Sequence, residues 1–181
     1  MTDLVRGDDG LLRCPWGAST PDYQRYHDTE WGRPVHGDVA VFERLTLEAF
    51  RAAFDRFDIE RVATYAEPER ERLMSDAGIV RNRAKVEATI ANARAAAALR
   101  EAEGDGALDG LVWSFAPAGR RARPRRLADL TASTAESTAL AKELKRHGFV
   151  FVGPTTMHAA MQAMGLVDDH LTGCAAVRGA G

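Results

Sequence analysis

Apolar residues recur every three or four positions along most of the chain, which is the spacing of amphipathic helices. Residues that favour helices, mainly Ala, Leu, Arg and Glu, dominate, and runs of β-branched residues are short. We therefore predict an all-α protein. No stretch approaches the roughly 18 consecutive apolar residues of a membrane span, so none is predicted.

Individual helices follow from this spacing and from the residues that can cap them. Asp38 is suited to be the N-cap of a helix whose apolar face runs from Val41 to Phe57. Pro154 is well placed at a first helical position. Further helices are predicted from about Pro68 to Gly78, from Arg83 to Leu99, from a cap at Ser133 or Thr134 to His147, and from Pro154 to Met164.

The remaining segments define the predicted domain organisation. The acidic, glycine-rich residues 101–110 are predicted as a loop, residues 111–115 as a short apolar element, and the five arginines of residues 120–126 as an exposed, mobile segment. A length of 181 residues suits one compact domain or two small lobes sharing a cleft. We predict a flexible leader over 1–13, one domain of two helical lobes over 14–177, and a tail over 178–181.

The net charge and the first 13 residues argue against two classes of protein. The net charge of −2 argues against a generally cationic nucleic-acid coat, although it allows a local basic face. The first 13 residues are polar and carry three aspartates, so they do not have the pattern of a secretory signal. We therefore expect a monomeric cytoplasmic protein.

Two cysteines lie near opposite ends of the chain, and each has a histidine within reach. His170 and Cys174 are four residues apart, so one helical turn can aim both at the same point, and Cys14 with His27 supplies a second pair. Two thiolates and two imidazoles complete a tetrahedral zinc ion without an open position, which is typical of a structural site. Two plain buried thiols are the alternative, since a cytoplasmic disulfide is disfavoured.

A second motif spans Leu144 to Thr156, where two predicted helices flank a short apolar segment with a glycine at either side. Such glycines permit positive φ and let backbone N–H groups approach a phosphate, while the following helix presents its positive end. A plain helical hairpin is the competing interpretation. The predicted DNA contacts are Gly148, Phe149, Val152 and Gly153, together with the cationic turn of Arg81, Arg83 and Lys85.

The order of these motifs resembles that of the helix-hairpin-helix DNA glycosylases and, within them, the 3-methyladenine-DNA glycosylase I family. The resemblance covers nearly all of residues 14–174. The segments that carry it are Cys14-Pro15-Trp16, Tyr26 to Gly32, Leu45 to Glu48, Asp76 to Ile79, Trp113-Ser114-Phe115, Gly148 to Gly153 and Asp169 to Cys174.

This resemblance implies a helix-hairpin-helix glycosylase fold that hydrolyses the N-glycosidic bond of 3-methyladenine in double-stranded alkylated DNA. The family's base-contacting carboxylate falls on Glu48, and Tyr26 is expected to orient water or complete the pocket. Aromatic walls fall on Trp16, Tyr23 and Trp31, whose stacking faces suit a cationic base; core packing is the alternative for each. The family's zinc ligands fall on Cys14, His27, His170 and Cys174.

The chain departs from the family pattern in two places. Between Phe50 and Arg51 roughly fifteen residues, about one average helix, are absent, and they supply part of the family's pocket and its wedge. The apolar stripe continues across the join, so we predict one fused helix, an open pocket beside Glu48 and reduced activity. Thr155 stands where bifunctional relatives carry a lysine nucleophile, so no lyase step is expected.

The sequence leaves two questions open: the role of Asp168, and whether the chain is an active enzyme. Asp168 is suited either to support a cationic sugar in the transition state or to cap a helix. A chain that retained the hairpin but lost the pocket would be a non-catalytic, zinc-stabilised DNA-binding module. A chain in which the hairpin is merely structural would be a protein-interaction domain.

Overall fold

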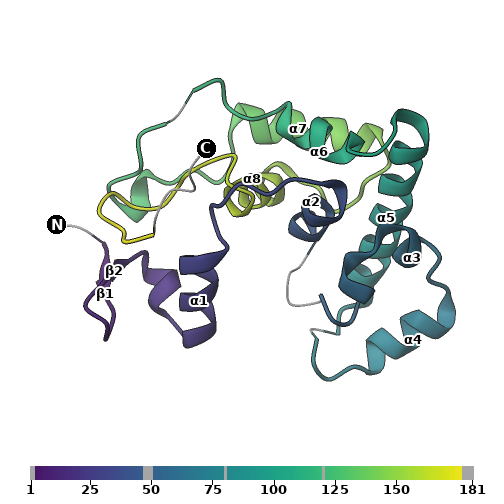
Figure 1. Ribbon diagram of the computed structural model, residues 1–181, viewed down its shortest axis with the longest axis horizontal. Coiled ribbons are helices and arrows are strands. Elements are labelled where there is room, and N and C mark those ends of the chain that lie inside the picture. Colours follow the sequence, from purple (N-terminus) through teal and green to yellow (C-terminus); the bar gives the residue numbers. More distant parts are fainter. Residues whose placement is uncertain (1–2, 47–50, 80, 120, 177–181) are drawn as a thin grey trace.

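The computed structural model describes residues 3–46, 51–79, 81–119 and 121–176. These residues contain eight α-helices, short 3-10 helices and one two-stranded sheet (Figure 1). The predicted helical class is thus confirmed as a mostly helical fold, with the small sheet as an exception. No described helix is both long enough and apolar enough to cross a membrane.

The N-terminal residues form an ordered hairpin where the sequence predicted a flexible leader. Strand β1 (Val5–Arg6) pairs antiparallel with β2 (Leu12–Arg13), with Val5 opposite Arg13. A 3-10 helix, η1 (Pro15–Ala18), leads into α1 (Pro21–Thr29), whose N-cap Thr20 accepts a hydrogen bond from the backbone N–H of Tyr23. The C-terminal segment lies at the same end of the molecule as this hairpin (Figure 1).

The other helices build the main core. Helix α8 lies near the middle of the molecule, packed against α7, and α5 packs against α3 at the opposite end from α1 (Figure 1). The bounds are α2 (Asp38–Leu45), η3 (Asp55–Phe57), α3 (Ile59–Ala63), α4 (Glu67–Ser75), α5 (Arg83–Glu103), α6 (Ala107–Trp113), η4 (Leu127–Asp129), α7 (Ala135–Arg146) and α8 (Pro154–Ala163). A smaller cluster of Cys14, Leu171 and Cys174 joins the chain's two ends.

Several predicted boundaries are confirmed. Thr134 is the N-cap of α7, and its side chain accepts a hydrogen bond from the Ser137 N–H. Pro154 occupies the first turn of α8. Helix α5 starts at Arg83 as expected and runs on to Glu103, so the predicted loop over 101–110 was wrong: only residues 104–106 separate α5 from α6.

The predicted fused helix through Phe57 was also wrong. Helix α2 ends at Leu45, and η3 has three consecutive residues with positive φ, Asp55 (50°), Arg56 (57°) and Phe57 (57°). Left-handed backbone is unfavourable for such residues. Here it lets the rings of Phe54 and Phe57 stack at 5.9 Å inside the core. The apolar stripe therefore marked buried positions correctly, but tertiary packing decided the backbone path.

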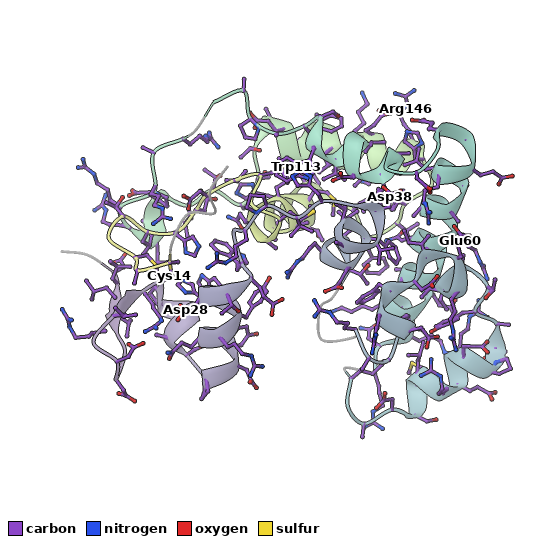
Figure 2. The ribbon with its side chains drawn as sticks, in the orientation of Figure 1. Cys14, Asp28, Asp38, Glu60, Trp113 and Arg146 are labelled. Carbon is purple, nitrogen blue, oxygen red and sulfur yellow. The ribbon has the colours of Figure 1, made fainter. Side chains whose placement is uncertain are left out.

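Asp38 does not cap α2 as predicted, because Gly37 holds the N-cap position. The Asp38 carboxylate is buried and accepts hydrogen bonds from the N–H groups of Gly106 and Asp109, both at 2.9 Å. It therefore stabilises the start of α6, which is distant in sequence (Figure 2 shows Asp38 and Trp113 on neighbouring elements).

The described part of the arginine-rich segment is mostly exposed, as predicted, and its backbone contacts the C-terminal segment. Thr172 donates its backbone N–H to the Pro124 carbonyl at 2.8 Å, and its hydroxyl donates to the Arg123 carbonyl at 3.0 Å. Arg123 is itself largely buried against the C-terminal segment. These contacts hold the segment against residues 168–176.

Candidate functional site

A cavity of about 670 Å³ opens between α1, the C-terminal end of α2, α5, the loop between α7 and α8, and α8 itself. The residues that matter most for its chemistry fall into three groups: aromatic rings, cations and hydrogen-bonding side chains. Its lining includes Trp16, Tyr23, Tyr26, Trp31, Arg44, Thr46, Lys85, Asn92, Phe151 and Gln162.

The aromatic residues predicted for a base pocket all line this cavity. Trp16 is at the centre of the group, with its ring centroid 5.1 Å from Trp31, 6.1 Å from Tyr26 and 6.3 Å from Tyr23. Tyr23 is half exposed at the rim, whereas Tyr26 and Trp31 are partly buried. The cluster forms one wall on which a flat ring can stack.

Tyr26 presents a hydroxyl to this cavity in its protonated form. Burial raises the pKa of Tyr26 above its ordinary value of 10.0. The guanidinium of Arg44 lies 5.9 Å from the centre of the Tyr26 ring and donates a hydrogen bond to Glu30 at 3.2 Å. At neutral pH the Tyr26 hydroxyl can therefore both donate and accept hydrogen bonds.

Glu48, the predicted base-contacting carboxylate, lies outside the described residues. The described lining of the cavity contains two cationic side chains, Arg44 and Lys85, and no carboxylate. Sequence reasoning identified Lys85 but not Arg44, because nothing in the pattern around Arg44 distinguishes it from a solvent-exposed helical arginine.

Only one of the two glycines in the loop between α7 and α8 has the positive φ that we predicted. Gly148 has φ +86°, as required just after a helix. Gly153 has φ −77°, and a Cβ there would meet only the Thr156 hydroxyl at 4.0 Å. The positive φ that we expected at Gly153 is instead found at Phe151 (φ +59°). Nothing within the described chain therefore requires glycine at 153.

The two other predicted DNA contacts of this loop, Phe149 and Val152, have buried side chains. Only their backbone groups can therefore face a ligand. Helix α8 begins directly after them, and its N-cap Gly153 provides no side-chain hydrogen bond to the first turn. The start of α8 thus keeps its N–H groups without a side-chain cap.

The cationic turn lies at the start of α5. Asn82 is the N-cap of this helix and accepts a hydrogen bond from the Lys85 N–H at 3.1 Å. Arg81 and Arg83 are exposed, and Arg83 lies within 4.0 Å of Glu67 and Glu87. Lys85 extends into the lining of the cavity. The structure thus brings one of the three predicted cations directly to the pocket.

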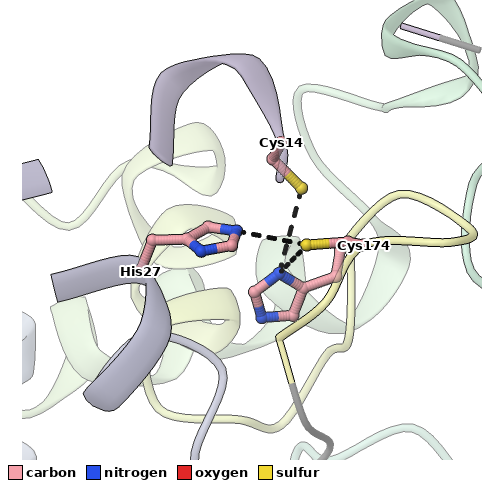
Figure 3. A group of neighbouring side chains, drawn as sticks. Cys14, His27 and Cys174 are labelled. Carbon is pink, nitrogen blue, oxygen red and sulfur yellow. Dashed lines mark hydrogen bonds between the residues drawn. The ribbon is translucent and has the colours of Figure 1, made fainter. Parts of the chain in front are cut away.

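The four predicted metal ligands converge at one buried point. The ligand atoms of Cys14, His27, His170 and Cys174 all lie within 4.8 Å of one another. Cys174 Sγ is 3.4 Å from His27 Nε2 and 3.8 Å from His170 Nδ1, and Cys14 Sγ is 3.9 Å from His170 Nδ1. Figure 3 shows Cys14, His27 and Cys174 turned toward one another from separate segments.

These distances and donors fit a tetrahedral zinc ion. Ligands about 2.0–2.3 Å from zinc are about 3.3–3.8 Å from one another. The hydrogen bond from the Cys14 thiol lowers the pKa of Cys174, and the two nearby imidazoles act in the same direction. The same hydrogen bond raises the pKa of Cys14, so the two sulfurs share one proton when no metal is bound. Both must be thiolates, the form that binds metal, when an ion is held.

Residues around the cluster orient His27. Its Nδ1 lies 2.8 Å from Asp28, which leaves Nε2 as the ligand atom. Asp28 in turn accepts hydrogen bonds from the buried Arg13 at 2.7–3.0 Å; Figure 2 places Asp28 beside Cys14 at this end of the molecule. Gly17 is also essential to this packing, since a Cβ there would lie 2.4 Å from the His27 ring.

Asp168 is already engaged by the fold. Its carboxylate accepts hydrogen bonds from Arg123 Nε at 2.9 and 3.1 Å and from the His170 N–H at 3.3 Å. These contacts connect the arginine-rich segment to the loop that carries His170. No described helix begins after Asp168, so the predicted helix cap was wrong, and the carboxylate pairs with Arg123 instead. A role in supporting a cationic sugar stays a prediction.

Comparisons with known proteins agree with this arrangement. Residues 16–178 match the model of the methyladenine glycosylase family. The chain is 40% identical over 183 residues to DNA-3-methyladenine glycosylase 1 of Escherichia coli (strain K12), covering 91% of this chain and 96% of the relative. It is 37% identical over 181 residues to DNA-3-methyladenine glycosylase of Haemophilus influenzae, covering 90% of this chain and 96% of the relative.

Solved structures give the same result. A 3-methyladenine DNA glycosylase I structure superposes with a TM-score of 0.81 at 40% identity, covering 90% of this chain and 98% of the other. The Staphylococcus aureus 3-methyladenine DNA glycosylase I, described for its recognition of 3-methyladenine, gives a TM-score of 0.82 at 30% identity, covering 91% of this chain and 95% of the other.

The alignments also bear on the segment predicted to be absent. The alignment extends over 183 residues, but only 91% of this 181-residue chain takes part in it. Some aligned positions of the relative therefore have no counterpart in this chain. An internal segment that the relative carries and this chain lacks would produce that difference.

Proposed function

Since the chain belongs to the methyladenine glycosylase family, we propose that it excises 3-methyladenine from double-stranded alkylated DNA by hydrolysing the N-glycosidic bond, acting as a monomer. The observation that carries this proposal is the cavity lined by Trp16, Tyr23, Tyr26 and Trp31 beside the start of α8. An enzyme that acts on a base within duplex DNA must extrude it into such a pocket.

The pocket suits the electronic character of this substrate. Methylation at N3 leaves adenine with a positive charge, so the base departs readily and needs selective capture more than strong acid catalysis. The faces of Trp16 and Trp31 attract a flat cation through their π-systems. The protonated Tyr26 hydroxyl can hold the attacking water or the base edge, and Glu48 is proposed to hydrogen-bond the base.

DNA is proposed to bind through the α7–loop–α8 unit as a helix-hairpin-helix. The first-turn N–H groups of α8 have no side-chain cap and carry the positive end of the helix dipole, which favours a phosphate. The open space beside Gly153 allows that phosphate to approach the backbone. Arg81, Arg83 and Lys85 add positive charge at the start of α5.

Zinc is proposed to be held by Cys14, His27, His170 and Cys174 as a structural ion. Four protein donors leave no position for substrate or water, so the ion would stabilise the fold and supply no chemistry to the reaction. Its ligands join η1 and α1 to the C-terminal loop, and Trp16 and Trp31 flank two of these ligands. The site would thereby fix the aromatic wall of the pocket.

The reaction is proposed to stop at the abasic site. A lyase step needs an amine nucleophile that forms an imine with the sugar. Thr155, in the first turn of α8, occupies the position where bifunctional relatives carry lysine. Its hydroxyl cannot form an imine.

The decisive experiment incubates the protein with methylated duplex DNA and measures the free bases released by chromatography. We expect release of 3-methyladenine, with no strand cleavage beyond that of the same abasic duplex incubated without the protein. Salt-dependent duplex binding without base release would instead support the non-catalytic DNA-binding module. Neither binding nor release would support the protein-interaction domain.

A further inference from the structure

Phe151 combines three features that rarely occur together in a packed loop. It is 62% exposed, the largest exposure among the large apolar side chains of the described residues. Its backbone has φ +59°, a left-handed conformation that residues other than glycine rarely adopt. It also lines the edge of the aromatic cavity. A large apolar side chain held in an unfavourable conformation and in solvent indicates a surface that meets a ligand.

The loop holds this conformation because Asn92 of α5 fixes the residue before it. The buried Asn92 side chain accepts a hydrogen bond from the Val150 N–H at 2.8 Å and donates one to the Val150 carbonyl at 3.1 Å. Phe149 and Val152 anchor the loop on either side through buried side chains. The exposed ring of Phe151 is therefore presented by a rigid frame.

We propose that Phe151 is a wedge that inserts its ring against the base pair next to the extruded nucleotide, and that Asn92 is the positioning residue that presents it. The inference rests on the proposed function, because it requires a base to leave the duplex. An extruded base leaves its neighbours without a stacking partner. Phenylalanine is among the apolar side chains that DNA-binding proteins insert between base steps to compensate that loss.

The location of the ring favours the duplex over the extruded base as its partner. Trp16, Tyr26 and Trp31 line the cavity and are partly buried, whereas Phe151 lines it from the exposed loop that is proposed to hold a phosphate. A side chain on that loop stays next to the strand from which the base departs.

The test uses a duplex with an abasic-site analogue at one position and 2-aminopurine at the adjacent position, and an intact duplex of the same sequence. Binding is measured at fixed salt by anisotropy, and stacking by 2-aminopurine fluorescence. We expect Phe151→Ala to weaken binding to the abasic duplex at least about tenfold, since one aromatic–base stack is worth about that much. Binding to the intact duplex should change less than about twofold.

Two further variants separate the ring from the backbone conformation. Phe151→Gly relieves the positive φ and also removes the ring, so the wedge predicts the same loss as in Phe151→Ala. Phe151→Tyr keeps the ring and should keep the affinity. Leu127→Ala removes a comparably exposed apolar side chain of η4 and serves as the matched control, expected to be unchanged.

Asn92→Ala should weaken binding to both duplexes, because the whole loop loses its frame, and should also reduce the 2-aminopurine response of the abasic duplex. Parent-like binding of Asn92→Ala would overturn the positioning role. Parent-like affinity and fluorescence of both Phe151→Ala and Phe151→Gly would overturn the wedge.

The failure of the wedge and that of the proposed function are distinguishable. If the parent protein prefers the abasic duplex and releases 3-methyladenine while Phe151→Ala does the same, only the wedge is wrong. If the parent neither releases the base nor distinguishes the two duplexes, the proposed function itself is wrong and the wedge falls with it.

Discussion

Gly17 shows how one residue without a side chain can control the metal cluster. The ring of His27 occupies the space where a Cβ of residue 17 would lie, at 2.4 Å from the ring carbon. An added methyl group must therefore displace either η1 or the imidazole. Because His27 is one of the four proposed zinc ligands, we expect even a small displacement to disturb a tetrahedral arrangement.

We predict that Gly17→Ala lowers zinc content well below one ion per chain and reduces the free energy of unfolding by about 1–3 kcal/mol, the range for overpacking. Elemental analysis and urea unfolding in zinc-containing buffer measure both effects. Gly110→Ala is the control, because a Cβ there has nothing within 4 Å in the middle of α6. Full zinc occupancy in Gly17→Ala would show that the imidazole can move without loss of the site.

Residue chemistry explains which site residues the sequence could reveal. Cys14, His27, His170 and Cys174 were recognisable because thiols and imidazoles are rare and have a specific chemistry. Gly17, Arg13 and Asn92 matter only through partners that are distant in the chain, such as Val150 for Asn92. No local pattern distinguishes such residues, so the sequence did not indicate them.

The β1–β2 hairpin is secured to α1 by an ion-pair cluster that should respond to pH. Arg13 is buried between Asp9 and Asp28, and its hydrogen bonds lower the pKa of Asp9 to about 2 and the pKa of Asp28 below its ordinary value. Both carboxylates thus bind protons less readily in the folded chain than in the unfolded chain, whose aspartates titrate near 3.9. Their contribution to stability is present above about pH 4 and is lost as pH falls toward 2.

We predict that Arg13→Gln makes the free energy of unfolding less dependent on pH between about 4 and 2.5, because both pKa values return toward normal. Urea unfolding with a chelator present throughout measures this without interference from metal release. Arg25→Gln is the control, since its pair with Asp22 is fully exposed. An unchanged slope in Arg13→Gln would mean that the carboxylates do not depend on Arg13.

The loop between α7 and α8 leads to a prediction about DNA. Gly153 has an extended backbone conformation that valine adopts readily, and a side chain there meets no other part of the described chain closely. Gly153→Val should therefore leave thermal stability nearly unchanged while its methyl groups block a phosphate. We expect about a tenfold loss of duplex affinity at matched salt.

Gly119→Val provides the matched control, because a Cβ at that position meets nothing within 4 Å. Titration of a labelled duplex at two salt concentrations measures both variants. Equal affinities of parent and Gly153→Val would place the phosphate contact elsewhere.

Prediction of the elements was accurate where local signals and tertiary packing agree. The cap at Thr134 and the proline at 154 gave the starts of α7 and α8. Local periodicity failed after Leu45, where burial of Phe54 and Phe57 required a left-handed turn. It also missed the two-stranded hairpin, whose strands are only two residues long.

Across the whole molecule, the segments that carry Cys14 and Cys174 meet at the Cys/His cluster and support one wall of the cavity. Cys14 and Cys174 lie in one small buried cluster, and Trp16 packs against it as well as into the cavity wall. Metal removal should therefore loosen the aromatic wall together with the termini. A second wall is formed by the C-terminal end of α2, where Arg44, Leu45 and Thr46 line the cavity.

The segment predicted to be absent belongs next to that second wall. The nearest described residues on either side of it are Thr46 and Arg51. An ion pair between Arg51 and Glu43 holds Arg51 close to α2. A carboxylate that faces an open cleft is better hydrated, so its hydrogen bond to a base is worth less than in a dry pocket. The resemblance also assigns a wedge to the absent segment, so we expect the wedge proposed at Phe151 alone to compensate less fully for unstacking, a cost of about a few kcal/mol.

We predict that inserting a family-like segment of roughly fifteen residues between Phe50 and Arg51 raises the single-turnover rate of 3-methyladenine release by orders of magnitude, since about 1.4 kcal/mol corresponds to tenfold in rate. Duplex affinity should change little, because the α7–loop–α8 unit is untouched. A glycine–serine insert of equal length restores chain length without side chains and should not raise the rate. If the chain as it stands already releases the base as fast as the extended one, the remaining residues form a complete pocket and the absent segment is dispensable.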